Sequence, residues 1–264
     1  MRFVVLLALV GCRFGFDEIE ANLGRDADTS TPDGSERCPS GRGPAMSLVE
    51  QGFCMDNTEV TKAQYDEFLA AAQPIDKSGP CTFNDTYEIL DFVRTATTNP
   101  DQAVAGIDWC DARDFCAWSG KRLCGKIGGG AIGYDEYATS QAQWYSACSR
   151  GGGQRFVYGD TARIGACHLD HLDTTTGLQA PVATYPECVL TGSNIYDLLG
   201  NLQEWTDACE ASGAAPETDL CRVVGGVWYF EASYSDCKFA DPSGGAGIPR
   251  DAASKHTGFR CCAD

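Results

Sequence analysis

Two stretches near the C-terminus decide the fold: Asn194-Ile-Tyr-Asp-Leu-Leu-Gly-Asn-Leu-Gln-Glu-Trp-Thr206 and Thr257-Gly-Phe-Arg-Cys-Cys-Ala-Asp264. The first contains a Gly-Asn pair, which is typical of a turn. The second ends the chain shortly after two adjacent cysteines, and the whole chain carries 15 cysteines in 264 residues. That density in a chain of this size is typical of an oxidising compartment, such as the periplasm or the cell surface. We therefore expect an exported protein.

The N-terminus carries an export signal. A positive charge at Arg2 precedes a continuous apolar run from Phe3 to Val10, which suits a secretory core and is too short to span a bilayer. Leu9-Val10-Gly11-Cys12 resembles a bacterial lipobox, so we expect residues 1–11 to be a lipoprotein signal peptide and Cys12 to be lipidated. The alternative is an ordinary signal peptide in which Cys12 is incidental. Arg13 after the cysteine favours the outer membrane of a Gram-negative cell envelope.

Composition divides the mature chain in two. Residues 12–37 are rich in Asp, Gly, Ser, Thr and Pro, which is typical of a flexible tether. Residues 38–264 show no fixed-period repeat and are numerous enough to bury a core, so we expect one domain there. The formal net charge of −17 argues against nucleic acid as a partner, because phosphates would be repelled. It also disfavours adsorption to anionic lipid, which leaves the lipid anchor as the expected membrane contact.

The other 14 cysteines predict structural disulfides in preference to zinc. The sequence has no Cys-x-x-Cys pair and no His-Glu-x-x-His motif, and its three histidines are not spaced as ligands beside a cysteine pair. Fourteen cysteines are enough for seven disulfides. Short loops favour four of these pairs: Cys38–Cys54, Cys81–Cys110, Cys167–Cys188 and Cys209–Cys221.

Three amphipathic helices are predicted. A capping box at Thr61 and Gln64 opens the first, with Tyr65, Phe68 and Leu69 on one face. Asp108 begins the second, which Gly120 ends, and Ser140 caps a third that carries Trp144 and Cys148. Roughly half or more of the chain should be loop. The β-prone runs are short: Val182–Tyr185, Arg222–Val224 and Val227–Tyr229.

Motifs in collinear order across residues 53–262 resemble the formylglycine-generating (sulfatase-modifying-factor) family. Besides the two C-terminal stretches, they include Phe53-Cys-Met-Asp56, Gly120-Lys-Arg-Leu123, Gln143-Trp-Tyr-Ser-Ala-Cys-Ser-Arg-Gly-Gly152 and Arg222-Val-Val-Gly-Gly226. The resemblance implies an α+β fold, a C-type-lectin-like variant that is loop-rich and stabilised by disulfides. We expect a monomer.

The resemblance also implies the remaining disulfides. Cys116 would pair with Cys261 or Cys262, and Cys124 would take the other member of that pair. Cys148 would reach the region of Cys237.

The two catalytic cysteine positions of the family fall on Phe230 and Ser235, counted from Gly225-Gly226. Formylglycine generation, as the family performs it, needs two nearby thiols that bind Cu(I), a soft ion that prefers thiolate. A phenyl ring and a hydroxyl cannot replace them. Cys237 lies two residues beyond Ser235, which is about 6.6 Å along a strand, and is wanted for a disulfide. We therefore expect no catalytic residue and no copper.

One metal site is implied by the resemblance. Asn201 and Glu204 match positions at which family members hold Ca²⁺, and hard oxygen ligands suit that ion. The alternative is a Gly-Asn turn in which Glu204 accepts protein hydrogen bonds. His168 to Asp173 lies where a second Ca²⁺ could sit, but these residues match poorly, and we expect His168 and His171 to be loop residues.

Three functions remain open. The first is a lipid-anchored, non-catalytic binding or interaction module, with an unidentified protein or glycan as its ligand. The second is a formylglycine-generating oxidase that acts on a sulfatase cysteine. The third is a lectin-like carbohydrate binder, which rests on fold analogy and on Trp228, Tyr229 and Tyr234 as candidate exposed aromatic residues.

Overall fold

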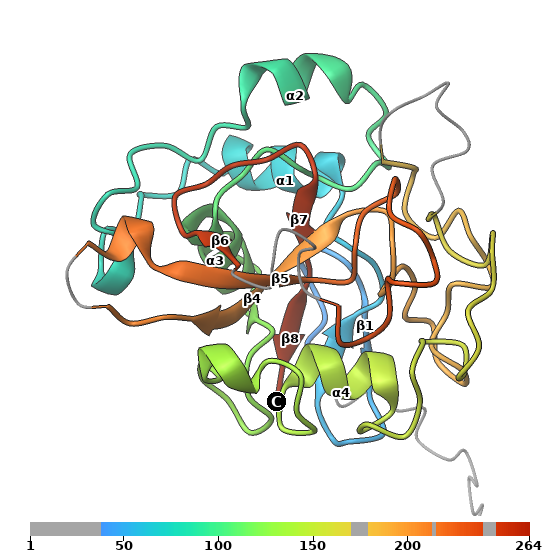
Figure 1. The fold of residues 1–264 in the computed structure, drawn as a ribbon. Coiled ribbons are helices and arrows are strands. Elements are labelled where there is room, and N and C mark those ends of the chain that lie inside the picture. Colours follow the sequence, from blue (N-terminus) through green and yellow to red (C-terminus); the bar gives the residue numbers. More distant parts are fainter. Residues whose placement is uncertain (1–37, 170–178, 213–214, 240–246) are drawn as a thin grey trace, which may run out of the picture. The chain divides into compact units, whose positions relative to one another are not determined.

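The fold comes from a computed structural model that describes residues 38–169, 179–212, 215–239 and 247–264 (Figure 1). The expected signal peptide and tether, including Cys12, lie outside the described residues, as do His171 and Asp173. Among the described residues, no helix combines the length and the apolar character that crossing a membrane requires.

Two small sheets form the framework. The first contains β1 (Met46–Leu48), β2 (Cys54–Asp56), β8 (Cys261–Ala263) and β3 (Arg122–Leu123), in that spatial order, with antiparallel neighbours. The second contains β6 (Ile248–Pro249), β5 (Leu220–Val224), β4 (Gln203–Cys209) and β7 (Thr257–Phe259), and β4 pairs with β7 in parallel. Figure 1 shows β7 running directly into β8, so the last strand of one sheet continues into the other. The single residue between them is Arg260.

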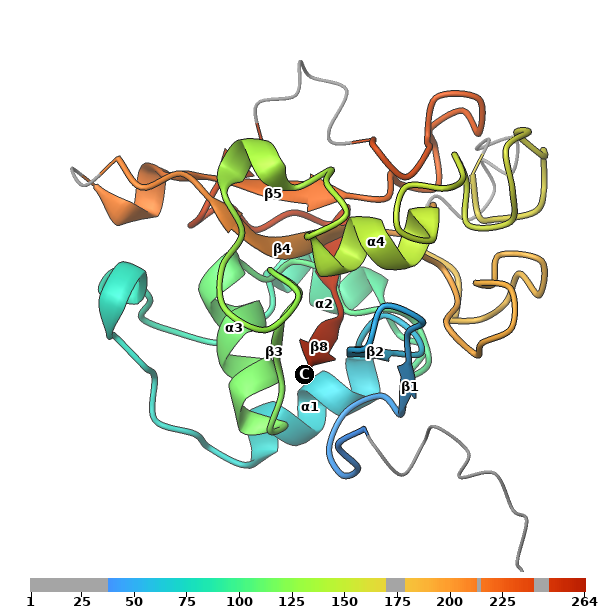
Figure 2. The same ribbon diagram turned by 90° about the horizontal axis from the view of Figure 1, so that it is seen from below.

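Four α-helices pack around these sheets: α1 (Lys62–Ala70), α2 (Asp91–Ala96), α3 (Trp109–Trp118) and α4 (Gln143–Ser149) (Figure 2). Short 3-10 turns lie at Gly79–Cys81, Tyr134–Glu136 and Pro216–Thr218. The predicted capping box at Thr61 and Gln64 is confirmed, and Asp108 forms a second one with Asp111. Both give the first backbone N–H groups of their helices a side-chain acceptor.

Two details of the sequence prediction are wrong. The N-cap of α4 is Ala142 rather than Ser140, because the Gln143 side chain accepts from Arg122 (2.7 Å) and Gly125 (3.1 Å) instead of reaching back toward Ser140. The runs Val182–Tyr185 and Val227–Tyr229 form turns, while Arg222–Val224 lies in β5 as expected. Ala183 has a φ of +56°, a left-handed conformation that a strand cannot contain.

The core has two main parts. Tyr65, Phe68 and Phe115 pack with Phe259 of β7, and the ring centroids of Phe115 and Phe259 are 5.3 Å apart. A second cluster surrounds Trp144 of α4 and includes buried residues of β2 and of the loops near Ile195–Leu199. The amphipathic faces predicted for α1 and α3 are thus the faces that the fold buries, with Leu69 only partly covered.

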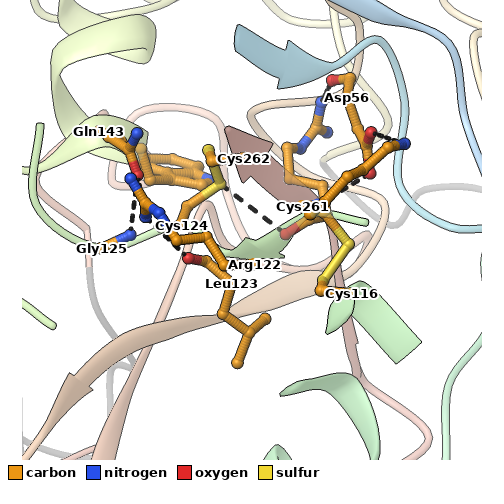
Figure 3. Close-up of a disulfide and its surroundings, with 12 residues drawn as sticks. Asp56, Cys116, Arg122, Leu123, Cys124, Gly125, Gln143, Cys261 and Cys262 are labelled. Atoms are coloured by element: carbon orange, nitrogen blue, oxygen red, sulfur yellow. Dashed lines mark hydrogen bonds and ion pairs between the residues drawn. A yellow bond between two sulfur atoms is a disulfide. The ribbon is translucent and has the colours of Figure 1, made fainter. Parts of the chain in front are cut away.

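Seven disulfides crosslink the described residues. The four pairs favoured by short loops are present in the structure. Cys116 is bonded to Cys261, Cys124 to Cys262, and Cys148 to Cys237. Figure 3 shows Cys261 and Cys262 pointing away from each other, since neighbouring side chains of a strand alternate between faces. Strand β8 is therefore bonded to the last turns of α3 through Cys116 and to the residue after β3 through Cys124.

The paired bridges at β8 predict strong non-additivity. When either Cys116–Cys261 or Cys124–Cys262 is removed, the other bridge still closes the long loop. Each double alanine variant should therefore lose only the free energy of unfolding that comes from closing the short remaining loop between the two bridges. Removing both opens a loop of more than a hundred residues. The quadruple variant should lose about 1 to 2 kcal/mol more than the sum of the two double variants.

Urea titration under non-reducing conditions measures these free energies of unfolding. Removing Cys209–Cys221, which closes a separate loop of sequence separation 12, is the control and should add to either double variant. Strict additivity of the two β8 bridges would contradict the interpretation.

Candidate functional site

The candidate site is the loop that follows β5. It begins at Gly225 and Gly226, whose φ values of +94° and +77° lie in the region that favours glycine. A Cβ atom on Gly225 would lie 2.8 Å from the carbonyl oxygen of Leu198, and one on Gly226 would lie 2.9 Å from Oγ of Ser235. Both glycines are therefore required for the close approach that folds residues 227–239 back over the end of the sheet.

Phe230 fills the first of the two sequence-predicted positions with a ring. Its centroid lies 4.7 Å from that of Tyr229 and 5.4 Å from that of Phe239. The ring packs against both core clusters and is partly buried. Phe230 is therefore a packing residue that closes the floor of the loop.

Ser235 occupies the second position and is completely buried. Its hydroxyl has no hydrogen-bond partner among the described residues. Both Ser235 and Phe230 approach the same point, because a Cβ built on Gly226 would lie 2.9 Å from Oγ of Ser235 and 3.6 Å from Cδ2 of Phe230. The structure thus brings together the two positions that the sequence singled out.

Cys237 is bonded to Cys148 of α4, and its backbone N–H donates to the carbonyl of Arg155 at 3.0 Å. Every cysteine among the described residues takes part in a disulfide. A disulfide sulfur is not a thiolate, so this loop offers no soft anionic ligand to Cu(I) and no nucleophile to a substrate thiol.

Aromatic side chains gather on the outer side of the loop. Tyr229 is 37% exposed and Tyr234 is 69% exposed, but Trp228 is only 6% exposed. The expectation that Trp228 is a candidate surface residue is wrong, because its ring packs on Tyr229 and on His256, with a centroid distance of 5.2 Å to the latter. Burial and the neighbouring Lys255 lower the pKa of His256.

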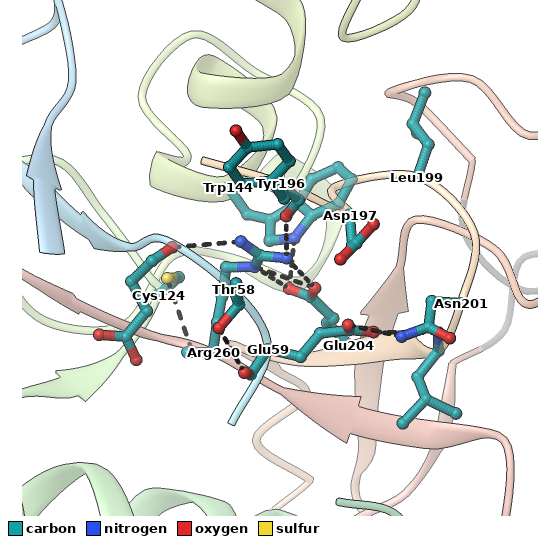
Figure 4. Close-up of polar contacts among 12 residues, drawn as sticks. Thr58, Glu59, Cys124, Trp144, Tyr196, Asp197, Leu199, Asn201, Glu204 and Arg260 are labelled. Carbon is teal, nitrogen blue, oxygen red and sulfur yellow. Dashed lines mark hydrogen bonds and ion pairs between the residues drawn. The ribbon is translucent and has the colours of Figure 1, made fainter. Parts of the chain in front are cut away.

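A buried ion pair lies beneath the site. Arg260 is completely buried and donates to both carboxylate oxygens of Glu204, at 2.7 to 2.9 Å (Figure 4). It also donates to the carbonyls of Asp56 and Tyr196. The second donor to Glu204 is Nε1 of Trp144, at 2.8 Å. These contacts join β4, β8, α4 and the loop before β4.

Two further acids face this pair. Glu59 accepts from Nδ2 of Asn201 at 2.8 Å and from the backbone N–H of Leu202 at 3.1 Å. Asp197 accepts from the backbone N–H of Ala183 at 2.6 Å. Burial raises the pKa of Glu59 well above its ordinary value, and the nearby carboxylates Asp197 and Glu204 add to that rise. Burial likewise raises the pKa of Asp197 to about 6.

The donors around Asn201 and Glu204 decide how well calcium fits. Oδ1 of Asn201 accepts from the backbone N–H of Ala180 at 2.8 Å and lies 3.2 Å from Nδ1 of His168. Both oxygens of Glu204 accept from Arg260. A divalent cation beside that guanidinium would meet a positive charge instead of a free ligand, so this donor set does not suit Ca²⁺ as it stands. Calcium binding by Asn201 and Glu204 stays a prediction that requires these contacts to rearrange.

His168 belongs to the same neighbourhood. Its ring stacks on Tyr185 at a centroid distance of 5.0 Å. The described residues contain no group of three or more His, Cys, Asp or Glu side chains that is arranged to hold a metal ion.

Glu59 and Asp197 are buried acidic neighbours of the ion pair that the sequence did not reveal. Glu59 follows β2 and contacts Asn201 across 142 positions of sequence. Asp197 does lie in the first quoted stretch, directly after Tyr196. Its left-handed φ of +56° is seen only in the structure. Pairing at such sequence separations cannot be read from spacing.

Comparisons with known proteins agree with this geometry. The profile of the "Sulfatase-modifying factor enzyme 1-like domain" matches residues 20–264. A Bos taurus protein named "Inactive C-alpha-formylglycine-generating enzyme 2" is 25% identical over 274 residues, covering 88% of this chain and 83% of the relative. The Bos taurus "Formylglycine-generating enzyme" is 24% identical, covering 85% of this chain and 69% of the relative.

Two solved structures share the fold. The crystal structure of CarF has a TM-score of 0.54 and 22% identity, covering 80% of this chain and 86% of that one. PvdO from Pseudomonas aeruginosa has a TM-score of 0.51 and 18% identity, covering 80% of each chain. At these identities the likeness concerns the fold alone.

The buried acids predict that the protein is more stable at pH 5 than at pH 8. A carboxyl with a folded pKa of about 6 and an ordinary value of 3.8 contributes stability that is complete below 3.8 and is lost as the pH rises through 6. Asp197 alone should lower the free energy of unfolding by about 1 kcal/mol between pH 5 and pH 8. Glu59 acts in the same direction, whereas the lowered pKa of His256 gives a contribution of opposite sign.

Chemical unfolding at a series of pH values, compared with Asp197→Asn, measures this effect. Asparagine tolerates the left-handed backbone and can accept the same N–H, so the variant should keep its stability at pH 5 and lose less than the native chain at pH 8. Asp56, whose pKa burial also raises to about 6, leaves a residual slope. A native stability that rises from pH 5 to pH 8 would contradict the interpretation.

Proposed function

The chain belongs to the sulfatase-modifying factor enzyme 1-like family, and we propose that within it the chain is a non-catalytic binding or interaction module of the cell envelope. The supporting observation is the loop after β5. Where the family reaction needs two thiols, this loop holds the ring of Phe230 and the buried hydroxyl of Ser235. The nearby Cys237 is tied to Cys148.

The chemistry follows from what these groups can donate. Cu(I) is soft and is held by thiolates, whereas a phenyl ring gives no ligand and a serine hydroxyl is hard and stays protonated at neutral pH. The residues present therefore do not fit a copper centre, and no redox step can be written through them. The name of the "Inactive C-alpha-formylglycine-generating enzyme 2" relative is consistent with a family that includes proteins without the activity.

The location of the module is proposed from the sequence. A lipid on Cys12 and a tether over residues 12–37 would hold the domain at the outer membrane of a Gram-negative cell, with the strongly acidic domain kept away from anionic lipid. The lipid would then supply membrane contact and the domain would supply recognition. The ligand is proposed to be a protein or a glycan, with Tyr229 and Tyr234 as exposed aromatic contacts.

The oxidase is the alternative that experiment should test first. A peptide with the sulfatase Cys-x-Pro-x-Arg motif should remain unoxidised when it is incubated with this protein, copper and oxygen, as judged by mass spectrometry. The Streptomyces coelicolor relative named "Formylglycine-generating enzyme" serves as the positive control. Aldehyde formation by the native chain that is lost in Cys237→Ala would overturn the proposal.

The same experiment has a gain-of-function arm. Phe230→Cys with Ser235→Cys should acquire a Cu(I) site, because both side chains converge on Gly226. Tyr229→Cys with Tyr234→Cys is the matched control, since it adds two thiols to the same loop at more exposed positions. Equal copper affinity of the two double variants would show that convergence at Gly226 does not matter.

Anchoring has its own test. Cys12→Ser should release soluble protein or leave an uncleaved precursor, because the serine hydroxyl is not the thiol that receives the lipid. Fractionation of cells expressing each form, followed by mass measurement of the N-terminal peptide, separates these outcomes. Arg13→Asp is a control that keeps the cysteine and should retain the lipid. Unchanged membrane association of Cys12→Ser would contradict the anchor.

A further inference from the structure

A cavity of about 370 Å³ lies beside the loop that follows β5. One wall comes from α4 and the residues after it, including Tyr145, Gly152 and Arg155. The other comes from Asp236, Cys237 and Lys238. Figure 2 shows the yellow-green segment after α4 close to the orange-red segment after β5. The cavity therefore forms between two stretches that are distant in sequence.

The two walls are fixed to each other. Nε of Arg155 donates to Asp236 at 2.9 Å, and Nη2 of Arg155 donates to the carbonyl of Ser233 at 3.1 Å. The backbone of Arg155 accepts from the N–H of Cys237 at 3.0 Å, and the Cys148–Cys237 disulfide joins the same walls covalently. Because four contacts fix the two walls, the cavity is preorganised, and a ligand would bind without first ordering the residues that line it.

The charges that line the cavity largely neutralise each other. Asp236 accepts from Arg155 and from the backbone N–H of Lys238, and Asp160 accepts from the backbone N–H of Arg155 at 3.0 Å. Two acidic and two basic side chains line the space. A charged ligand would have to compete with the existing ion pair, which makes an ion a poor occupant. A neutral ligand with both donors and acceptors could use the remaining lone pairs and N–H groups.

Tyr145 supplies a hydroxyl that the fold itself does not use. Its side chain is 6% exposed and lines the cavity. No hydrogen bond to this hydroxyl is present among the described residues, and it lies 3.7 Å from the point where a Cβ on Gly152 would stand. Gly152 and Gly153 leave that side of the cavity without side chains. This hydroxyl is not one of the buried side-chain atoms that lack a partner, so it faces the cavity, where a ligand can reach it.

We propose that this cavity binds one neutral sugar residue of a glycan. The proposal rests on the binding function proposed above and names its ligand class. The volume lies near the lower end of the range of about 300–1,000 Å³ for ligand sites, which limits the occupant to a small unit. A sugar hydroxyl can both donate and accept a hydrogen bond, so a neutral sugar can use the acidic and the basic side chains of the lining together with the Tyr145 hydroxyl.

Gly153→Leu provides a sharp test. Gly153 does not have a left-handed φ, and a Cβ on it would make only ordinary contact, 3.5 Å from the carbonyl oxygen of Arg150. A leucine at this lining position therefore adds bulk to the cavity wall without backbone strain. Calorimetry with the full chain and a panel of neutral oligosaccharides of glucose, galactose, mannose and N-acetylglucosamine should find binding that Gly153→Leu weakens by about tenfold or more. Tyr145→Phe, which removes one hydrogen bond, should weaken it about fivefold.

Thr191→Leu is the matched control. Thr191 lines a separate cavity of about 310 Å³, so a leucine placed there should leave sugar affinity unchanged. Binding should also persist in EDTA, because the proposed contacts use no metal. Absence of binding across the neutral panel, equal affinity in Gly153→Leu, or tighter binding of the charged sugar glucuronate would overturn the proposal of a neutral sugar. The aldehyde assay is independent, so a chain that binds no sugar and forms no aldehyde loses only this inference.

Discussion

The buried contact between Arg260 and Glu204 is the interaction on which the rest of the structure depends. Arg260 lies between β7 and β8, where the chain passes from one sheet to the other. Taking a guanidinium and a carboxylate out of water costs several kcal/mol per ion, and only complete hydrogen bonding offsets that cost. Here the two groups meet through both carboxylate oxygens, and the remaining donors of Arg260 reach backbone carbonyls of β2 and of the loop before β4. The ion pair can therefore form only when both sheets are in place.

This network and the loop after β5 are held by different forces. The network is polar and faces Glu59 and Asp197, so it carries more negative than positive groups in a buried space. The loop is held by the Gly225-Gly226 turn, by aromatic packing of Phe230 and by the Cys148–Cys237 bridge. Because neither set of contacts uses a free thiol, the fold can retain its framework while the positions that matter for the family reaction change.

Much of the framework could be predicted from the sequence, and the reasons are local. Capping at Thr61 and Asp108 is encoded within four residues, and Cys38–Cys54 closes a short loop. The partners of Cys116 and Cys148 needed family resemblance, because their separations of 145 and 89 residues exceed what loop length can decide. The predicted cap of α4 was wrong because the side chain of Gln143 accepts a hydrogen bond from Arg122, which is distant in sequence. Glu59 and Asp197 were missed for the same reason: tertiary contacts create their environment.

Phe230 and Ser235 together determine the packing of the loop as well as its chemistry. The hydroxyl of Ser235 is buried and has no partner among the described residues, which costs about 1–3 kcal/mol unless packing offsets it. Phe230 supplies such packing by linking the two core clusters beside Gly226. A site that needs a reactive group must keep it accessible, whereas this floor is closed by a ring and a buried serine. The cavity of about 370 Å³ is lined by Asp236, Cys237 and residues after α4, where polar groups are within reach of a ligand. Recognition there needs no thiol, so the proposed binding role is physically compatible with a phenyl ring at 230 and a hydroxyl at 235.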